Sequence, residues 1–303
     1  MYSETVKKKL LISFSGGRTS AYMTWWLLNH CQDKYEMIIV FANTGKEKEA
    51  TLNFVHRCDL HFGFNTVWIE GVTDPRTKYG NNVKVVDFAT ADRNGKPFEE
   101  MIKKHGIPNI TSPHCSRELK ERSIRAYAIS IGWKFKEYKT AIGIRADEPR
   151  RLNWKNAKRK NLIYPFATLK RTTKSDINLF WSKQQFDLEL KSYEGNCDFC
   201  WKKSCRKLMT IAKENPQVTT WWQEMETKYA NHIPAHRSEN KNIKLPVRFF
   251  RDNMTVSDII EDAKFPFRES IDDSKKIDQY SQLQIWNPDL DENGGCVESC
   301  EAF

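Results

Sequence analysis

The chain has 303 residues, of which 39% are hydrophobic and 29% are charged. This composition is typical of a globular protein, and the length allows a full hydrophobic core together with a second, smaller unit. The longest uninterrupted apolar run, residues 37–42, is far shorter than the ~20 residues that span a bilayer. The N-terminal residues lack the apolar core and cleavage site of a signal peptide, so we expect a reducing, cytoplasmic compartment and no membrane partner. There the eight cysteines are expected to be ligands or nucleophiles rather than disulfides.

Positive charge dominates, with 49 Lys and Arg residues against 39 Asp and Glu, a net charge of +10. It is concentrated in residues 145–174, which hold ten basic and two acidic residues, whereas residues 252–303 hold thirteen acidic and four basic ones. The basic stretch contains Trp154 and Tyr164, whose flat rings could stack on bases, so we expect a nucleic acid partner. A basic surface that only improves solubility is the alternative. The acidic tail either screens the basic face or is a solvated segment.

Apolar runs alternate with helical patterns along the first half of the chain. Strands are predicted at residues 10–14, 37–42, 66–69 and 138–144, and helices at 20–28, 47–58 and 116–131. This alternation predicts an α/β fold with a parallel sheet covered by helices. Further helices are predicted at 176–190, at 206–229 with a break near Pro216, and at 255–263. We therefore expect an α/β domain over residues 1–175 and a smaller helical, cysteine-bearing region with an acidic tail over residues 176–303.

A short glycine-containing loop, SGGRTS at residues 15–20, joins the first strand to the first helix. Glycines let the backbone turn tightly around an anion, and the helix N-terminus adds partial positive charge. The loop is neither a Walker A loop nor a Rossmann GxGxxG motif. It predicts a phosphate site built from Ser15, Gly16, Gly17, Arg18, Thr19 and Ser20. An ordinary strand–turn–helix connection is the alternative reading of the glycines alone.

With three further motifs, this loop resembles the ATP pyrophosphatases, the PP-loop superfamily that also contains the phosphoadenosine phosphosulfate (PAPS) reductases. SGGRTS is similar to the family's SGGxxS pyrophosphate loop, and FANTG at 41–45 to the turn after its second strand. GIRADEPRR at 143–151 resembles the GxRxxES…R segment that lies over the phosphates, and Tyr164-Pro165 the start of its YPL stretch. The resemblance covers roughly residues 8–230. It implies an adenine nucleotide α-hydrolase-like fold that uses ATP and Mg²⁺.

The resemblance extends the expected nucleotide site beyond the loop. The added residues are Asn43, Thr44, Gly45, Gly143, Arg145, Asp147, Glu148 and Arg151. Arg18 stands where ATP-using members often have Lys, although both neutralise phosphate. Pro149 replaces the usual Ser after Glu148. Asp147 and Glu148 either hold Mg²⁺ or pair with Arg150 and Arg151.

Three cysteines, Cys197, Cys200 and Cys205, lie in one loop before a predicted helix. Three thiolates leave a metal site one ligand short, and Cys115 is the best candidate for the fourth, with His114 as the alternative. The resemblance agrees, because members with an iron–sulfur centre take ligands from an early Cys followed by Arg and from a later CxxC. Four Cys ligands suit a [4Fe–4S] cluster or Zn²⁺, and the precedent of the family favours the cluster.

Two further thiols, Cys296 and Cys300, lie close to the C-terminus. In PAPS reductases a mobile tail delivers the nucleophilic cysteine, but the tail motif of that family, ECGxH, is absent here. Cys296 and Cys300 are therefore either a catalytic persulfide or disulfide pair, or part of an exposed terminus.

Together these features predict an ATP pyrophosphatase-type sulfurtransferase that adenylates its substrate and releases pyrophosphate. A sulfur nucleophile, held on the cluster or on a cysteine persulfide, would then displace AMP, whose phosphate is stabilised by the loop and by Arg18 and Arg145. A sulfur donor protein is a further expected partner. The acceptor is expected to be a nucleic acid, tRNA or DNA, or a nucleotide. A PAPS or adenylyl sulfate reductase that releases sulfite is one alternative, and a non-catalytic nucleotide- or nucleic-acid-binding module is another. The intact SGG loop and the missing tail motif count against the reductase.

Overall fold

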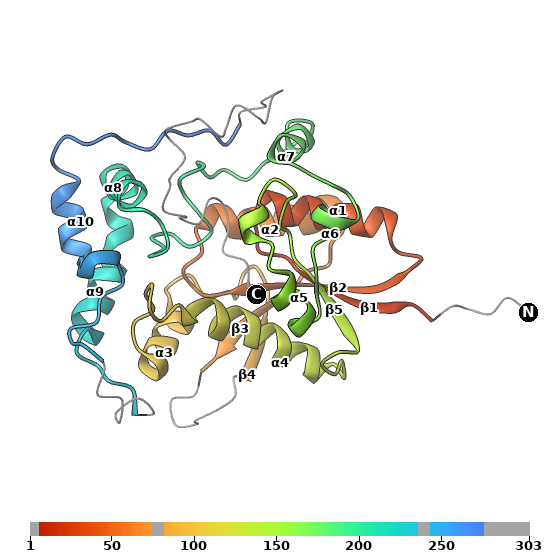
Figure 1. The fold of residues 1–303 in the computed structure, drawn as a ribbon, viewed down its shortest axis with the longest axis horizontal. Coiled ribbons are helices and arrows are strands. Elements are labelled where there is room, and N and C mark those ends of the chain that lie inside the picture. Colours follow the sequence, from red (N-terminus) through yellow and green to blue (C-terminus); the bar gives the residue numbers. More distant parts are fainter. Residues whose placement is uncertain (1–5, 74–81, 236–242, 276–303) are drawn as a thin grey trace, which may run out of the picture.

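The computed structural model of the chain describes residues 6–73, 82–235 and 243–275. Its centre is a six-stranded sheet with the strand order β4-β3-β2-β1-β5-β6 (Figure 1). The strands are β1 (Lys8–Ser13), β2 (Tyr35–Asn43), β3 (Val67–Val72), β4 (Asn82–Val86), β5 (Tyr138–Ala141) and β6 (Leu162–Ile163). All neighbouring strands are parallel except β3 and β4. The predicted α/β fold with a parallel sheet is confirmed, with an antiparallel edge strand that was not predicted.

Both faces of the sheet are covered, as alternating side chains of β1 show. Leu10 and Ile12 pack in a core with α1 (Arg18–His30), α2 (Glu49–Phe62) and α7 (Lys174–Trp181). Leu11 points to the opposite face, where it packs with α4 (Arg122–Ser130). In Figure 1, α1, α2 and α7 lie above the strands and α4 lies below them. Burial on both faces explains why the first strands are continuous apolar runs.

The remaining helices flank this sheet or follow it. They are α3 (Lys96–His105), the π-helix η1 (Ser116–Glu121), η2 (Pro149–Arg151), α5 (Trp154–Lys160), α6 (Pro165–Thr168), α8 (Cys205–Glu214), η3 (Pro216–Thr219), α9 (Thr220–Tyr229), η5 (Arg251–Asn253) and α10 (Val256–Asp262). Helices α8, α9 and α10 stand together at one end of the molecule, at the left of Figure 1. No helix in the described ranges is long and apolar enough to cross a membrane.

A second core joins α3 to the C-terminal helices, with Phe98 of α3 packed beside Phe199, Trp222 and Ile259. Conversely, Ile177 and Trp181 of α7 belong to the core over the sheet. The two cores therefore do not divide at residue 175, where the sequence predicted a boundary. Helix α3 lies before residue 175 but packs with the C-terminal helices. Helix α7 lies almost entirely after residue 174 but packs in the core over the sheet.

Several predicted helices have different bounds in the structure. The predicted break near Pro216 is confirmed, since α8 and α9 are separate helices there. The helix predicted over 176–190 is wrong in its second half, because the chain turns after Trp181 and returns Phe186 to the core. The helix predicted over 116–131 begins as the π-helix η1. The strand predicted to reach residue 144 ends at Ala141.

Candidate functional site

The loop at residues 15–20 connects β1 to α1 and is closed by its own serines. The hydroxyls of Ser15 and Ser20 are 2.9 Å apart, and Ser20 also donates to the Gly17 carbonyl at 3.0 Å. Gly16 has a φ of +79°, and a Cβ there would lie 2.7 Å from Thr51 Cγ2. The N-cap residue of α1 is Gly17, which has no side chain to cap the helix, and the first turn has no acidic residue. A helix N-terminus of this kind can donate its first N–H groups to an anion.

A second segment crosses this loop after β5. Gly143 passes so close that a Cβ there would lie 3.0 Å from Ser20 Cα, so a side chain at this position would press on the backbone of α1. The close approach brings Arg145, which is buried, to the start of α1, with Nη1 donating to Thr19 Oγ1 at 3.4 Å. The structure thus brings the predicted Gly143 and Arg145 onto the loop.

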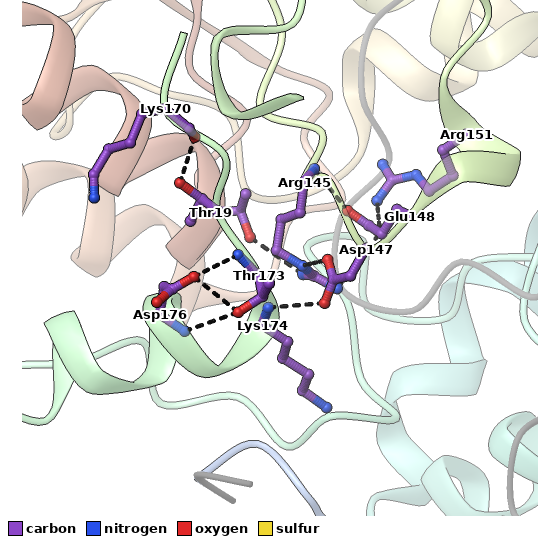
Figure 2. A network of polar contacts seen from close by, with 10 residues as sticks. Thr19, Arg145, Asp147, Glu148, Arg151, Lys170, Thr173, Lys174 and Asp176 are labelled. Atoms are coloured by element: carbon purple, nitrogen blue, oxygen red, sulfur yellow. Dashed lines mark hydrogen bonds and ion pairs between the residues drawn. The ribbon is translucent and has the colours of Figure 1, made fainter. Parts of the chain in front are cut away.

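Figure 2 shows Arg145 between Thr19 and two carboxylates. Its Nε lies 2.9 Å from Asp147 Oδ1, and its Nη2 lies 3.7 Å from Glu148 Oε1. Glu148 also pairs with Arg151 at 2.5 Å, and Asp147 accepts from the backbone N–H of Lys174 at 2.9 Å. Asp147 and Glu148 were expected either to hold Mg²⁺ or to pair with Arg150 and Arg151. In the structure they form ion pairs, with Arg145 in the place expected for Arg150. A Mg²⁺ role for them stays a prediction.

Arg18 belongs to the loop, but its side chain is directed away from it. Its Nε lies 2.9 Å from Asp187, while Nη1 donates to Asn178 at 3.0 Å and to the Ser274 carbonyl at 2.6 Å. Burial raises the pKa of Asp187, although the nearby Arg18 charge opposes the rise. In this arrangement the guanidinium of Arg145 donates to Thr19 in the first turn of α1, whereas the guanidinium of Arg18 pairs with Asp187.

The turn after β2 is held rigidly beside the loop. Asn43 donates to Glu70 Oε1 at 2.8 Å, and the Thr44 hydroxyl donates to Glu47 at 2.8 Å. Gly45 has a φ of +79°, and a Cβ there would lie 2.4 Å from Asp92 Oδ1. The three residues predicted from the TG turn therefore have fixed positions at the carboxyl end of the sheet.

The cysteine loop, which carries Cys197, Cys200 and Cys205, is hydrogen-bonded to residues that follow the turn after β2 and to the loop at residues 15–20. The Lys48 N–H donates to the Asn196 carbonyl at 2.7 Å, and the Asp198 N–H donates to the Lys46 carbonyl at 2.9 Å. The side-chain amide of Asn196 donates to the carbonyl of Ser15. A segment 181 residues away in sequence thus contacts the loop at residues 15–20.

Three of the four cysteines predicted as metal ligands line one small pocket. Its wall is formed by Thr44, Phe98, Cys115, Ser116, Lys120, Cys197, Cys200, Trp201 and Trp222. Cys205, the first residue of α8, instead has its Sγ 3.7 Å from Met254 Sδ, and burial raises the pKa of its thiol. Cys296 and Cys300 lie outside the described residues.

The donor set of this pocket fits a thiophilic metal, since sulfur ligands suit Zn²⁺ and iron–sulfur clusters. Within the described residues, no group of three His, Cys, Asp or Glu side chains already has an arrangement that would hold a metal ion. The four-cysteine centre therefore stays a prediction, with Cys115, Cys197 and Cys200 as its nearest approach.

Cys115 caps the π-helix η1, and π-helical turns occur frequently at functional sites. Glu118, fully buried in η1, lies 2.8 Å from Arg117 and 2.6 Å from Arg122. Burial raises the pKa of Glu118, but the Arg117 hydrogen bond, with the charges of His105 and Arg122, outweighs it and holds that pKa below its usual range. The turn that carries Cys115 is therefore anchored by a buried ionised carboxylate.

Charged residues that were not predicted from the sequence join the turn after β2 to the cysteine-lined pocket. Glu47 accepts from Thr44 and lies 3.5 Å from Lys120, and both charged side chains are buried. Lys46 pairs with Asp198 at 2.8 Å. The sequence signal was the charged run KEKE directly after the TG turn, where charges of both signs follow a buried strand.

These features define an α/β protein with a mostly parallel six-stranded sheet, whose carboxyl-end turns meet a loop of cysteines. One similar protein is the "Uncharacterized nin region protein ORF290" of Escherichia phage lambda, which is 30% identical over 297 residues. The match covers 97% of this chain and 94% of the phage protein. The chain belongs to the family of that phage protein. No protein-family model matches the chain.

Proposed function

We propose that the chain is an ATP pyrophosphatase-type enzyme that adenylates its substrate and then transfers sulfur to it. The observation that supports this most directly is the shared pocket of Thr44 and three cysteines. Thr44 belongs to the turn that the resemblance assigns to the adenine nucleotide. A nucleotide turn and a set of thiols around one pocket suit a reaction in which activation and sulfur transfer follow one another without release of the intermediate.

The phosphates of ATP would lie against the first turn of α1. There the N–H groups of the first turn and the hydroxyl of Thr19 would supply hydrogen-bond donors, while the Ser15 and Ser20 hydroxyls bond within the loop and hold its shape. Arg145 adds a buried positive charge 3.4 Å from Thr19 Oγ1. Mg²⁺ would be held by Asp147 and Glu148 after they exchange their arginine partners for the metal.

In the first step a substrate oxygen attacks the α-phosphorus, the bond to the bridging oxygen of the β-phosphate breaks, and pyrophosphate leaves. In the second step sulfur at the sulfide level, supplied by a donor protein, bonds to the activated carbon. The carbon–oxygen bond breaks, and AMP leaves as an anion that the N–H groups of the loop and Arg145 stabilise. Neither step changes the oxidation state of the substrate carbon, so no external oxidant or reductant is required.

Cys115, Cys197 and Cys200, with Cys205 or His114 as a fourth ligand, would hold a [4Fe–4S] cluster or Zn²⁺. When bound, an iron–sulfur cluster supplies a site for binding and activating sulfur, whereas Zn²⁺ supplies a structural clasp. The thiols themselves are kept beside the nucleotide turn by the backbone hydrogen bonds between residues 46–48 and 196–198.

The acceptor proposed is a nucleic acid, tRNA or DNA, or a nucleotide. Support comes from the concentration of basic residues at 145–174, which begins at the nucleotide-site residue Arg145 itself. An acceptor bound along this stretch would enter the site from the side of Arg145.

The test is pyrophosphate release from ATP and Mg²⁺ by anaerobically purified protein, with tRNA and single-stranded DNA as acceptors. Arg145→Lys should lower the rate on the order of 10²-fold, because it removes one preorganised donor to the developing charge. Arg57→Lys on α2 is the matched control, since Arg57 is exposed and lies outside both the proposed site and residues 145–174, and it should retain the rate. Sulfite release from PAPS would instead identify a reductase, and ATP binding without pyrophosphate release would identify a binding module.

The metal is tested on the same protein by counting iron, sulfide and zinc and by recording the visible spectrum. About four irons with absorption near 400 nm would identify a cluster. Cys197→Ser should remove the metal, whereas Cys58→Ser, at a buried core position, should retain it in the folded fraction. Unchanged metal content in Cys197→Ser would show that the cysteine loop is not the metal site.

A further inference from the structure

The segment from η2 to the end of α5 presents a basic surface around one exposed aromatic ring. Trp154 is 55% exposed, and the neighbouring Arg150, Lys155, Lys158 and Arg159 are exposed as well. We call these five residues the α5 surface. The two acidic residues just before this segment, Asp147 and Glu148, pair with Arg145 and Arg151 instead. No acidic side chain of the described residues forms an ion pair with the four bases of the α5 surface.

The indole of Trp154 is held in place although much of it is exposed. Its ring meets the buried Tyr164 edge-on, with centroids 5.3 Å apart and an interplanar angle of 76°. The Tyr164 hydroxyl donates to the Asn153 carbonyl at 3.4 Å, and Asn153 caps α5 by accepting from the Asn156 N–H. A large aromatic ring fixed in this way, with much of its surface in solvent, offers a flat face on which a base can stack.

The α5 surface is linked to both halves of the proposed site. At its start, Arg151 pairs with Glu148, which lies 3.7 Å from Arg145 at the phosphate loop. At its end, Lys160 pairs with Glu121 at 2.5 Å, and Glu121 belongs to η1, the helix capped by Cys115. A ligand lying along α5 is therefore directed toward the nucleotide loop at one end and the cysteine-bearing helix at the other.

We propose that the α5 surface binds single-stranded nucleic acid, with one base stacked on Trp154 and the phosphates against Arg150, Lys155, Lys158 and Arg159. Exposed basic side chains around a flat ring match the phosphates and the base faces of an unpaired strand. A duplex keeps its base faces covered by their neighbours, so it cannot use Trp154 in this way. This inference rests on the proposed function for its acceptor, and it deepens that proposal by specifying an unpaired segment.

The experiment measures binding of the full chain, without ATP, to fluorescein-labelled oligonucleotides by fluorescence anisotropy. Single-stranded DNA, single-stranded RNA and a duplex of the same sequence are compared. Trp154→Ala should weaken single-strand binding on the order of 10-fold, the usual effect of losing one stacked base. Trp154→Phe should retain most of the affinity because a flat ring remains. Phe265→Ala removes another exposed aromatic ring, 67% exposed, and should have no effect.

A charge variant tests the phosphate contacts separately. Lys155→Gln with Lys158→Gln should weaken binding and reduce the slope of log affinity against log salt by about 1.4, since each lost contact on a single strand contributes about 0.7. Lys7→Gln with Lys34→Gln makes the same charge change at the amino ends of β1 and β2, where both lysines are exposed. That control should leave the slope unchanged.

Equal binding by Trp154→Ala and the unchanged protein, or duplex binding as tight as single-strand binding, would overturn the inference. A preference for RNA or for DNA supports it and identifies the acceptor. Because the assay contains no ATP, its outcome is separate from that of the proposed function. Oligonucleotide binding without pyrophosphate release would overturn only the proposed enzymatic activity. Pyrophosphate release without oligonucleotide binding would overturn only the proposed role of the α5 surface.

Discussion

Among single residues, Gly16 is constrained by its backbone and by its neighbour at once. Its positive φ disfavours any residue with a Cβ, and that Cβ would lie 2.7 Å from the fully buried Thr51. Gly132 has nearly the same φ, +80°, but nothing lies within 4 Å of a Cβ placed there. Comparing Gly16 with Gly132 therefore separates the cost of backbone strain from the cost of the close approach in the loop at residues 15–20.

We predict that Gly16→Ala lowers the free energy of unfolding by about 2–4 kcal/mol, since left-handed strain and overpacking add. Gly132→Ala should cost only about 1 kcal/mol, the strain alone. Urea denaturation measures both, and binding of a fluorescent ATP analogue should be lost only in Gly16→Ala. Equal losses of stability in the two variants would show that Thr51 gives way to the extra methyl group.

The polar residues of the site differ in how far sequence alone could place them. Ser15, Ser20, Thr44 and Arg145 could be predicted because turns at the carboxyl ends of parallel strands meet at one edge. The direction of the Arg18 side chain could not, because it depends on Asp187, 169 positions later in the sequence. A loop motif fixes its backbone locally, whereas a long side chain follows the partners that tertiary packing supplies.

At the level of elements, α3 is tied to α9 by a hydrogen-bonded carboxylate. Glu99 on α3 accepts from Lys228 Nζ and from the Tyr229 hydroxyl, both at 2.6 Å. The hydrogen bond from Lys228, followed by the one from Tyr229, lowers the pKa of Glu99 to about 2. Because this pKa is lower in the folded protein than in the unfolded chain, the link stabilises the fold above the unfolded pKa near 4.5. The stabilisation is lost as the pH falls toward 2.

We therefore predict that Glu99→Gln reduces the free energy of unfolding by about 1 kcal/mol at pH 7. This loss is smaller than for a fully buried carboxylate because solvent screens the charges at this partly exposed position. The variant should also lose part of the decline in stability between about pH 4.5 and 2 that the unchanged protein shows. Glu100→Gln, on the same helix, makes the same charge change and serves as the control. If both variants keep the same pH profile as the unchanged protein, the Glu99 link contributes nothing to stability.

The elements also show why some of the fold escaped prediction. The first strands and helices were predictable because a parallel sheet buried on both faces gives long apolar runs. Helix α3 has buried Phe98 and Met101 among lysines and glutamates, a pattern that indicates a partner surface only once α9 is in place. Helix α5 is short and mostly exposed, so its sequence carries no apolar periodicity. The π-helical turn of η1 likewise has no distinct residue pattern.

For the whole molecule, Trp222 connects the C-terminal core to the turn after β2. Its fully buried indole packs edge-on against Phe98 and Phe249, and its N–H donates to Asp198 at 2.8 Å. Asp198 pairs in turn with Lys46, directly after the turn that contains Thr44. The two cores therefore share a hydrogen-bonded link in addition to the backbone pairing of the cysteine loop. A protein linked in this way is expected to unfold as one unit.

We predict that Trp222→Ala lowers the free energy of unfolding by about 3–5 kcal/mol, the usual cost of truncating a buried Trp. Trp154→Ala, at a half-exposed position, should cost about 0.5 kcal/mol, in the range of surface substitutions. Hydrogen exchange of β1 and α9 peptides across a urea series distinguishes global from local effects. In Trp222→Ala both segments should lose protection at the same, lower urea concentration. If β1 keeps its original protection while α9 opens, the two cores unfold independently, and the link through Asp198 does not couple them.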